Sequence, residues 1–415
     1  MHVSKVNIGG FALDEFPQTK MKTVVVVGAR PNFMKAAPII DRMKRYDDFL
    51  EPILVHTGQH YDQKLSQLFF DDLKLPKPDI FLGVGSGSHA VQTAKIMVEF
   101  EKIVIENRPD IVVVLGDVNS TIACAIVAAK CHIPIAHVEA GLRSFDMGMP
   151  EEINRVLTDR ISDYLFVTET SGYQNLIKEG ADQDRIFFVG NVMIDSLLAH
   201  LKIAEERPIL AELGLESKKF ALLTLHRPDN VDDQKTLTHI IEALAIVSRK
   251  IPIIFPCHPR TRLNIDKFNL GSYFDDARLR LVEPAGYLDF LRLQSAAAMV
   301  LTDSGGVQEE TTILNIPCLT LRKNTERPVT ISEGTNILVG PYPEKIVAAV
   351  ENVLDGNVKS GSIPKYWDGR AAERIVEIFL KIHENLSVSH QTKCDTDNIR
   401  AANIGMSEAT MSREG

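Results

Sequence analysis

Short apolar runs alternate with longer amphipathic stretches over most of the chain. Residues 24–27 are four consecutive valines, which is typical of a parallel strand buried on both faces. This run ends at Gly28, and a helical pattern follows over residues 31–45. Further strand-like runs lie at residues 51–56, 111–115, 133–138, 164–167 and 186–189, with helical patterns at residues 89–106 and 120–131 between them. This alternation predicts βαβ units and a mostly parallel sheet.

A second series of the same kind begins near residue 220. Its strand-like runs lie at residues 220–225, 251–255, 280–281, 299–302, 318–321 and 336–339, and its helical patterns at residues 235–249 and 287–296. The sequence therefore predicts an α/β fold with two Rossmann-like parallel-sheet domains, residues 21–190 and 191–368. Residues 1–20 are interpreted as an extension before the fold, and residues 387–415 as a polar tail without regular structure.

Composition narrows the class of protein. The chain has 415 residues, of which 45% are hydrophobic and 24% charged, and its net charge is −9, so its bulk surface does not suit nucleic acid. Five cysteines without a CxxC pair argue against a disulfide framework or a structural zinc site and favour a reducing cytoplasm. No apolar run approaches the ~20 residues that span a bilayer, and no signal peptide is evident.

Two strand-to-helix turns are candidates for binding an anion. Ser304, Gly305 and Gly306 open a helix, where free N–H groups and the helix dipole favour a phosphate. Glu310, one turn later, could accept hydrogen bonds from sugar hydroxyls. In the first half, Arg30 follows a strand, and Lys35 lies one turn further on. A plain helix start and ordinary surface charge are the alternative interpretations of these two turns.

Both halves end their first strand in an Arg-Pro turn, and His226 precedes the second of these turns. Ligands of open α/β sheets bind beyond the carboxyl ends of the strands, so two domains that face each other would bring both turns to one cleft. The chain lacks the GxGxxG and Walker spacings, so a dinucleotide cofactor is not supported.

Several carboxylates follow strands of the first half. Asp117 and Glu139 each end a strand, and Glu151 and Glu152 begin a helix soon afterwards. Carboxylates gathered at one sheet edge are costly unless they are paired or used in chemistry. If the cluster is structural, Arg143 and Arg155 are the expected partners; if it is functional, one or both of the helix-start carboxylates take part.

Taken together, these motifs resemble the non-hydrolysing UDP-N-acetylglucosamine 2-epimerases over residues 21–386. The resemblance is carried, in order, by Gly28-Ala29-Arg30-Pro31, Thr57-Gly58-Gln59-His60, Gly116-Asp117, His137-Val138-Glu139-Ala140-Gly141-Leu142-Arg143, Pro150-Glu151-Glu152-Ile153-Asn154-Arg155, His226-Arg227, Asp303-Ser304-Gly305-Gly306-Val307-Gln308-Glu309-Glu310 and Thr325-Glu326-Arg327-Pro328.

The resemblance implies a glycosyltransferase-B-like fold with the site in the interdomain cleft, and a helix near residues 369–385 that packs on the first domain. It implies interconversion of UDP-N-acetylglucosamine and UDP-N-acetylmannosamine without nicotinamide or metal, a homodimer, and a second, activating UDP-sugar site lined by Gln59. By the same resemblance, the acid/base carboxylates are Asp117, Glu139 and Glu151, with His226 near the diphosphate. The implied substrate-binding residues are Arg30, Lys35, Arg143, Phe290, Ser304, Gly305, Gly306, Glu310 and Arg327.

Four alternatives share part of this pattern. A hydrolysing 2-epimerase would share almost every motif, and related enzymes act on diacetamido uronic acid derivatives. A glycosyltransferase of the same fold would need an acceptor, and a sugar-nucleotide sensor would be expected to lack the three carboxylates. The hypothesis for the chemistry is elimination of UDP to a 2-acetamidoglucal, followed by re-addition on the opposite face.

Overall fold

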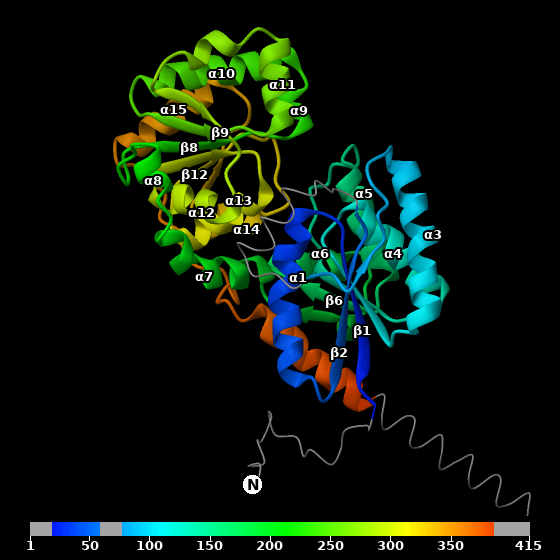
Figure 1. Ribbon diagram of the computed structural model, residues 1–415. Helices are drawn as coiled ribbons and strands as arrows, with labels where there is room; N and C mark the ends of the chain where they lie inside the picture. The colour runs from blue at the N-terminus through cyan, green and yellow to red at the C-terminus, as the bar shows by residue number, and fades with distance from the viewer. Residues whose placement is uncertain (1–18, 59–76, 386–415) are drawn as a thin grey trace, which may run out of the picture.

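The computed structural model describes residues 19–58 and 77–385, which form two α/β lobes, each built on one parallel sheet (Figure 1). The first sheet has the strand order β3-β2-β1-β4-β5-β6-β7 and the second has the order β10-β9-β8-β11-β12-β13. Both sheets therefore start in the middle and wind outward in two directions. The predicted fold class is confirmed. The expected polar tail, and the extension up to residue 18, lie outside the described residues.

Strand positions follow the apolar runs closely. The strands of the first sheet are β1 (Met21–Val27), β2 (Leu50–His56), β3 (Ile80–Phe81), β4 (Ile111–Leu115), β5 (Ile135–Ala140), β6 (Tyr164–Val167) and β7 (Ile186–Phe188). Those of the second are β8 (Ala221–Thr224), β9 (Ile253–Pro256), β10 (Leu279–Val282), β11 (Met299–Thr302), β12 (Cys318–Thr320) and β13 (Asn336–Leu338). Only β3, which has two residues, was not predicted, because so short a pair carries no periodic signal.

Helices cover both faces of each sheet. In the first domain they are α1 (Arg30–Met43), α3 (His89–Asn107), α4 (Asn119–Lys130), α5 (Pro150–Ile161) and α6 (Thr170–Lys178), with 3-10 turns η2 (Lys44–Tyr46) and η3 (Gln183–Arg185). In the second they are α8 (Ile209–Glu212), α9 (Pro228–Val231), α10 (Gln234–Ser248), α11 (Pro259–Lys267), α12 (Tyr287–Ala296), α13 (Gly305–Leu314), α14 (Pro328–Ser332) and α15 (Pro343–Leu354), with η4 (Gly271–Phe274). Because both faces of β1 are covered, all four of its valines are buried.

The chain passes from the first domain to the second along α7 (Val192–Glu205), which lies between the lobes in Figure 1. This helix packs against α1 on one side and against α12 and α13 on the other. Leu288, Leu291 and Val329 of the second domain join the main apolar core of the first. The two domains therefore share a packed apolar contact.

After α15 the chain returns to the first domain, where residues 371–385 form a last helix. The carboxylate of Asp195 in α7 accepts hydrogen bonds from the Ala371 and Ala372 N–H groups, at 3.1 and 2.8 Å, and so caps this helix. The ring of Phe379 meets that of Phe166 edge to face, with centroids 5.6 Å apart. The last helix thus packs on the first domain.

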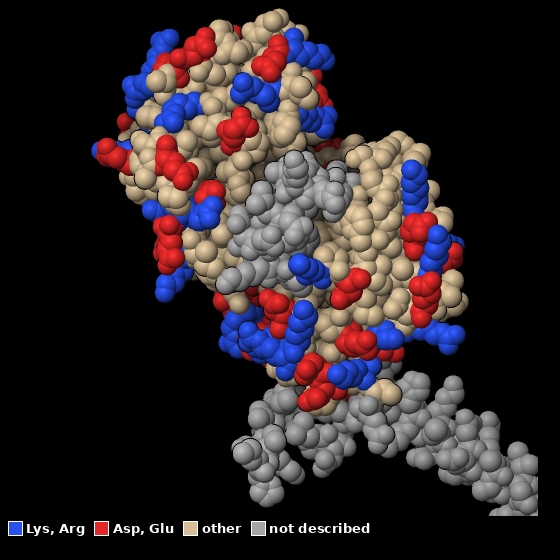
Figure 2. Space-filling model, viewed as in Figure 1, with Lys and Arg blue, Asp and Glu red and all other residues tan. Residues whose placement is uncertain are grey.

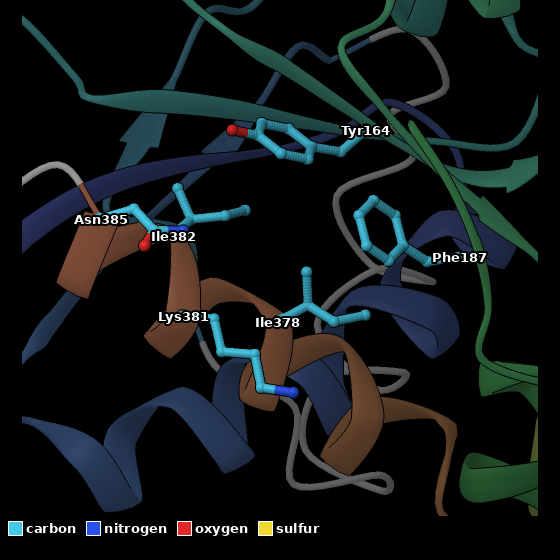
Figure 3. Close-up of a pocket in the computed structure, with 6 residues that line it drawn as sticks. All are labelled: Tyr164, Phe187, Ile378, Lys381, Ile382 and Asn385. Atoms are coloured by element: carbon cyan, nitrogen blue, oxygen red, sulfur yellow. The ribbon is translucent and has the colours of Figure 1, made fainter. Parts of the chain in front are cut away.

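Where the last helix crosses the sheet it leaves a shallow apolar hollow, lined by Tyr164, Phe187, Ile378, Lys381, Ile382 and Asn385 (Figure 3). Tyr164 is the first residue of β6, so the hollow lies toward the amino end of that strand. Basic and acidic side chains are interspersed over both lobes on the face shown in Figure 2. In the described part of the chain, no helix is both long and apolar enough to cross a membrane.

Candidate active site

The carboxyl ends of β4 and β5 form the centre of the candidate site. These strands are neighbours, with Leu115 paired to Val138, so the turn after β4 lies beside the end of β5. Gly116, with φ +65°, makes that turn, and a Cβ atom there would approach Lys35 Nζ to 3.2 Å and Glu139 Oε2 to 3.6 Å. Asp117 and Glu139 are therefore brought to one edge of the sheet, as predicted, and Lys35 joins them.

Glu139 sits in a β-bulge. The pairing of β5 with β6 shifts register between Val138 and Ala140, and Glu139 has a left-handed φ of +73°. Its side chain is buried, and Oε2 lies 2.6 Å from Lys35 Nζ. Oε1 is buried with no hydrogen-bond partner among the described residues. A bulge re-aims a side chain, and backbone strain of this kind costs about 1–3 kcal/mol, so the fold sustains an unfavourable local geometry at this carboxylate.

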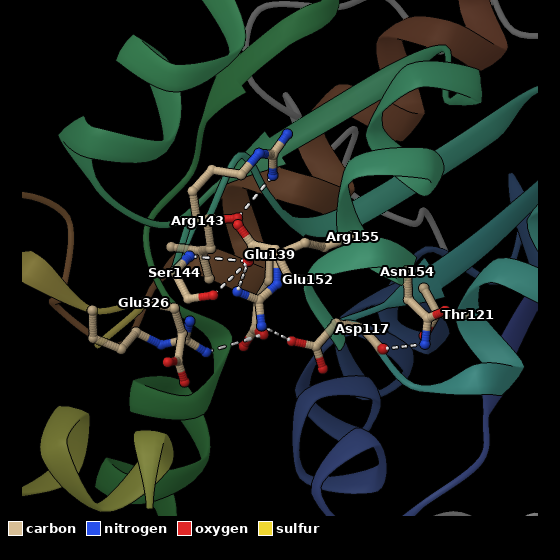
Figure 4. A network of polar contacts seen from close by, with 12 residues as sticks. Asp117, Thr121, Glu139, Arg143, Ser144, Glu152, Asn154, Arg155 and Glu326 are labelled. Carbon is tan, nitrogen blue, oxygen red and sulfur yellow. Dashed lines mark hydrogen bonds and ion pairs between the residues drawn. The ribbon is translucent and has the colours of Figure 1, made fainter. Parts of the chain in front are cut away.

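Asp117 is held by Arg155. Arg155 Nη2 donates to Asp117 Oδ2 at 2.6 Å, and Figure 4 shows the guanidinium between Asp117 and Glu152. Although burial alone would raise the pKa of Asp117, the charges of Arg155 and Lys35 outweigh it and lower that pKa. Asp117 is therefore ionised at neutral pH, and its side chain keeps 30% of its surface exposed.

The two carboxylates at the start of α5 have different environments. Glu152 is buried; its Oε2 accepts from the Ser144 N–H at 2.9 Å and from Arg155 Nη1 at 2.7 Å, and its Oε1 accepts from the Phe145 N–H at 2.9 Å. Glu151 is half-buried and makes no side-chain hydrogen bond or ion pair with another described residue. The structure thus gives Glu152 a structural task and leaves Glu151 available.

Arg143 points away from this group of carboxylates. Its Nε and Nη2 donate to the Glu179 carboxylate at 2.8 and 2.7 Å, and Nη1 lies 2.7 Å from Asp159 Oδ2. The expectation that Arg143 would pair with the site carboxylates is wrong, because Asp159 and Glu179 engage its guanidinium, whereas Arg155 does pair with them. A role for Arg143 in binding substrate stays a prediction.

In the second domain, His226 follows β8 and lies beside the end of β11. Asp303 is fully buried and accepts from the backbone N–H groups of His226 and Arg227 at 3.1 and 2.9 Å. Its Oδ1 also lies 3.1 Å from His226 Nδ1, while the imidazole remains 40% exposed. Although burial would raise the pKa of Asp303, these contacts with His226 and Arg227 lower it. Asp303 is thus an anion that orients His226.

Ser304 is the N-cap residue of α13, and Gly305 and Gly306 are its first two residues. A Cβ atom on Gly305 would lie 2.7 Å from Glu326 Oε1, whereas one on Gly306 would meet nothing within 4 Å. Glu310 accepts a hydrogen bond from Tyr287 Oη at 3.2 Å, and burial raises its pKa to about 7. The open space at Gly306 leaves the start of α13 accessible, as at helix N-termini that bind a phosphate.

Arg327 connects the two domains. It precedes α14, and its Nη2 lies 3.5 Å from Glu139 Oε2 across the domain junction. Its Nε donates to the buried Glu309 Oε1, and its Nη1 is buried with no hydrogen-bond partner among the described residues. Within residues 19–58 and 77–385, one Glu139 oxygen and one Arg327 nitrogen thus both lack a partner at the junction, which is costly unless a ligand takes part.

Phe290 lies on α12, half-buried in a small apolar cluster of the second domain. Arg30 begins α1, but its side chain is not among those that the structure describes. The prediction for Gln59 also lies outside the described residues.

The chain matches the family model for UDP-N-acetylglucosamine 2-epimerase over residues 42–380. A relative of the same name from Methanocaldococcus jannaschii is 45% identical over 365 residues, which are 86% of this chain and 98% of the relative. The chain belongs to the UDP-N-acetylglucosamine 2-epimerase family. The family indicated by the motifs, and the expectation of an epimerase, an isomerase, are thereby confirmed.

Other members of this 2-epimerase family widen the comparison. UDP-2,3-diacetamido-2,3-dideoxy-D-glucuronate 2-epimerase from Pseudomonas aeruginosa is 40% identical over 366 residues, 87% of this chain and 100% of that protein. The M. jannaschii enzyme in complex with UDP-GlcNAc and UDP superposes with a TM-score of 0.81 and 45% identity, covering 87% of this chain and 100% of that one. The Neisseria meningitidis enzyme bound to UDP-GlcNAc superposes with a TM-score of 0.80 and 29% identity, and the match covers 87% of this chain and 100% of that one.

In this 2-epimerase, sequence reasoning gave no task to several buried ionisable residues around the site. Glu309 holds Arg327, and burial raises the pKa of Glu309 to about 7. Glu169, buried at the start of α6, accepts from Ser171 Oγ, and burial raises its pKa to about 7 as well. Glu309 lies inside the motif of residues 303–310, but its contact with Arg327 depends on tertiary folding. Glu169 carried no sequence signal.

Proposed function

We propose that the protein catalyses the reversible epimerisation of UDP-N-acetylglucosamine to UDP-N-acetylmannosamine at C2. The single observation that carries the proposal is Glu139, a buried carboxylate next to Lys35 and at the same sheet edge as Asp117, one of whose oxygens has no partner among the described residues. The family and the substrate named for the M. jannaschii enzyme support the choice of sugar nucleotide.

UDP is expected to lie between the domains. Its diphosphate would face the start of α13 at Ser304, Gly305 and Gly306, with positive charge from Arg30, Lys35 and Arg327 and a donor from His226. Glu310 would accept from the ribose hydroxyls, and Phe290 would contact the nucleotide. Arg327 Nη1 supports this arrangement, because it has no partner in the described part of the chain and a diphosphate oxygen would give it one.

The C2 proton of the sugar is not next to a carbonyl, so direct abstraction is difficult. We propose that the C1–O bond breaks with its electron pair leaving on UDP, while a carboxylate takes the C2 proton, which gives a 2-acetamidoglucal. A proton is then delivered to the opposite face of C2, and the UDP oxygen re-forms its bond to C1. Asp117, Glu139 and Glu151 divide the acid and base tasks, each worth about 10²- to 10⁴-fold in rate.

Contacts to the departing diphosphate would lower the barrier further. Each preorganised donor at an oxyanion is worth about 2.7–4 kcal/mol, and Arg327, His226 and the start of α13 are the candidates. Substrate labelled with ¹⁸O in the C1–O bridge tests this step. Scrambling of the label into the non-bridging β-phosphate oxygens is expected, and epimerisation without any scrambling would contradict cleavage of the C1–O bond.

Product analysis tests the proposed function against its rivals. Incubation of the protein with UDP-N-acetylglucosamine should give an equilibrium mixture with UDP-N-acetylmannosamine. Release of UDP and free N-acetylmannosamine would instead indicate a hydrolysing epimerase, and turnover only with an added acceptor would indicate a glycosyltransferase. No turnover with tight binding would indicate a sensor.

A second candidate substrate is a UDP-diacetamido glucuronate, favoured by the 40% identity to the P. aeruginosa enzyme. The two substrates differ at C3 and C6 of the sugar. Comparing kcat/KM for both with one preparation decides between them, and we expect the larger value for UDP-N-acetylglucosamine.

A homodimer is part of the proposal. Val91, Val98 and Ile105 recur every seven residues on α3 and are 49%, 58% and 63% exposed, which is unusual for large apolar side chains on one stripe. The helices α3, α4 and α5 pack in series on this flank of the first domain (Figure 1). Sedimentation equilibrium should give twice the chain mass.

A cytoplasmic location and a second UDP-sugar site near Gln59 are also part of the proposal. Sigmoidal dependence of the rate on substrate concentration would support the second site.

A further inference from the structure

His137 precedes Glu139 by two residues, but its side chain faces the protein interior. It is fully buried, with Nδ1 2.6 Å from Asp159 Oδ1 and Nε2 2.8 Å from the Gly116 carbonyl oxygen. A carbonyl oxygen has no hydrogen to donate and can only accept a hydrogen bond. The same is true of an ionised carboxylate. A neutral imidazole donates from one nitrogen alone, whereas the imidazolium donates from both and satisfies both contacts.

Asp159 is the other group at this contact that can carry the second proton. Asp159 Oδ2 accepts from the Gly141 N–H at 3.0 Å and lies 2.7 Å from Arg143 Nη1. With two donors on Oδ2, one of them a guanidinium, the ionised carboxylate is favoured. Although burial would raise the pKa of Asp159, the contacts with His137 and Arg143 lower it. The proton therefore stays on His137.

Charge balance in the surroundings agrees with this assignment. Arg143 is shared between Asp159 and Glu179, so that one cation faces two carboxylates. A charged His137 supplies a second cation, so that two cations face two carboxylates, of which the Glu179 side chain is 42% exposed. Glu139, further along the same strand, takes its own positive charge from Lys35 and Arg327 and does not compete for His137.

We propose that His137 donates from both ring nitrogens, as an imidazolium, in the folded protein and is a positioning residue for both catalytic turns. Through Nε2 it fixes the Gly116 carbonyl, immediately before Asp117. Through Asp159 it is joined to the Gly141 N–H, on the far side of the Glu139 bulge. One buried ion pair thus holds the turn that presents Asp117 and both ends of the bulge that presents Glu139, without touching the substrate.

Neutron diffraction from deuterium-exchanged crystals of the full chain, grown at pH 8.5, tests the charge state without any substitution. Deuterium on both Nδ1 and Nε2 of His137, with none on Asp159, is expected. A map with only one deuterated ring nitrogen, or with deuterium on the Asp159 carboxylate, would overturn the proposal.

The positioning role rests on the proposed function and is tested by kinetics. His137→Gln should lower kcat for C2 hydrogen exchange about 100-fold, the effect of a misplacement near 1 Å, while KM and UDP affinity stay unchanged. His132→Gln, at an exposed histidine after α4, is the matched control and should match the wild type. Wild-type kcat in His137→Gln would overturn the positioning role, whereas absence of exchange in the wild type would overturn the proposed function instead.

Discussion

Glu139 combines a left-handed backbone, nearly complete burial and one oxygen without a partner among the described residues. Each feature is costly by itself, and the nearby Lys35 stabilises only the other oxygen. Proteins retain such geometry where the surrounding structure enforces it, commonly at functional sites. These features support the proposal that Glu139 acts as a base toward the substrate.

Glu139→Gln should abolish C2 hydrogen exchange while UDP still binds. The amide keeps the size of the side chain but cannot take up a proton. Exchange is followed by NMR in deuterated water and UDP affinity by calorimetry, with Glu101→Gln, an exposed residue of α3, as the control. Near-normal exchange in Glu139→Gln would remove this residue from the mechanism.

Glu151 and Glu152 are adjacent in sequence, yet they should respond differently to substitution. Glu152→Ala removes the partner of Arg155 and of two backbone N–H groups, so we expect a loss of about 3–5 kcal/mol in unfolding free energy. Glu151→Ala should cost less than about 1 kcal/mol but lower the rate about 10²- to 10⁴-fold. Urea unfolding and turnover are measured on both variants. Equal free energies of unfolding for the two variants would contradict the structural task of Glu152.

Element boundaries were largely predictable because both sheets are parallel and covered on both faces. Strands of this kind are apolar throughout, as the four valines of β1 show, and their turns then fall at the predicted carboxyl edge. The bulge at Glu139 was not predictable, because residues 135–140 form a strand whose shift in register depends on its pairing with β6. The choice between Glu151 and Glu152 likewise depends on how residues 144–145 fold back on α5.

Gly141, just after the bulge, has φ +80°, and a Cβ there would lie 2.3 Å from the Gly172 carbonyl oxygen. Gly180 has φ +81° and open space around it, which makes it a matched control. Gly141→Ala should therefore destabilise the protein by about 2 kcal/mol more than Gly180→Ala, because overpacking adds to the same backbone strain. Urea unfolding measures the difference, and equal losses would show that the close contact relaxes freely.

At the scale of the whole molecule, the site depends on contact between two domains. Arg327 approaches Glu139 from the other sheet, and Glu169 and Glu309 are buried around it. Sequence patterns predicted that both domains face one cleft, but not which buried carboxylates meet there, because these contacts join segments far apart in the chain. Burial raises the pKa of both Glu169 and Glu309 to about 7, which makes the junction sensitive to pH.

Burial raises the pKa of Glu169 from 4.5 to about 7, so the folded protein holds a proton there that the unfolded chain releases between these pH values. The contribution of Glu169 to stability is thus fully present below pH 4.5 and falls as the pH rises toward 7, by about 3 kcal/mol. Glu169→Gln should flatten the decline in unfolding free energy between pH 5 and 8. Glu106→Gln, at an exposed residue of α3, should keep the wild-type slope, and an unchanged slope in Glu169→Gln would contradict the assignment.

In the proposed reaction, carboxylates of the first domain exchange the C2 hydrogen of the sugar, while groups of the second domain stabilise the UDP that leaves C1. The most direct measurement is NMR of UDP-N-acetylglucosamine with the purified wild-type protein in deuterated water, following C2 and the anomeric signals together. We expect UDP-N-acetylmannosamine to form with deuterium at C2, and deuterium then to appear at C2 of the remaining substrate. Epimerised product that keeps its original hydrogen at C2 would contradict it.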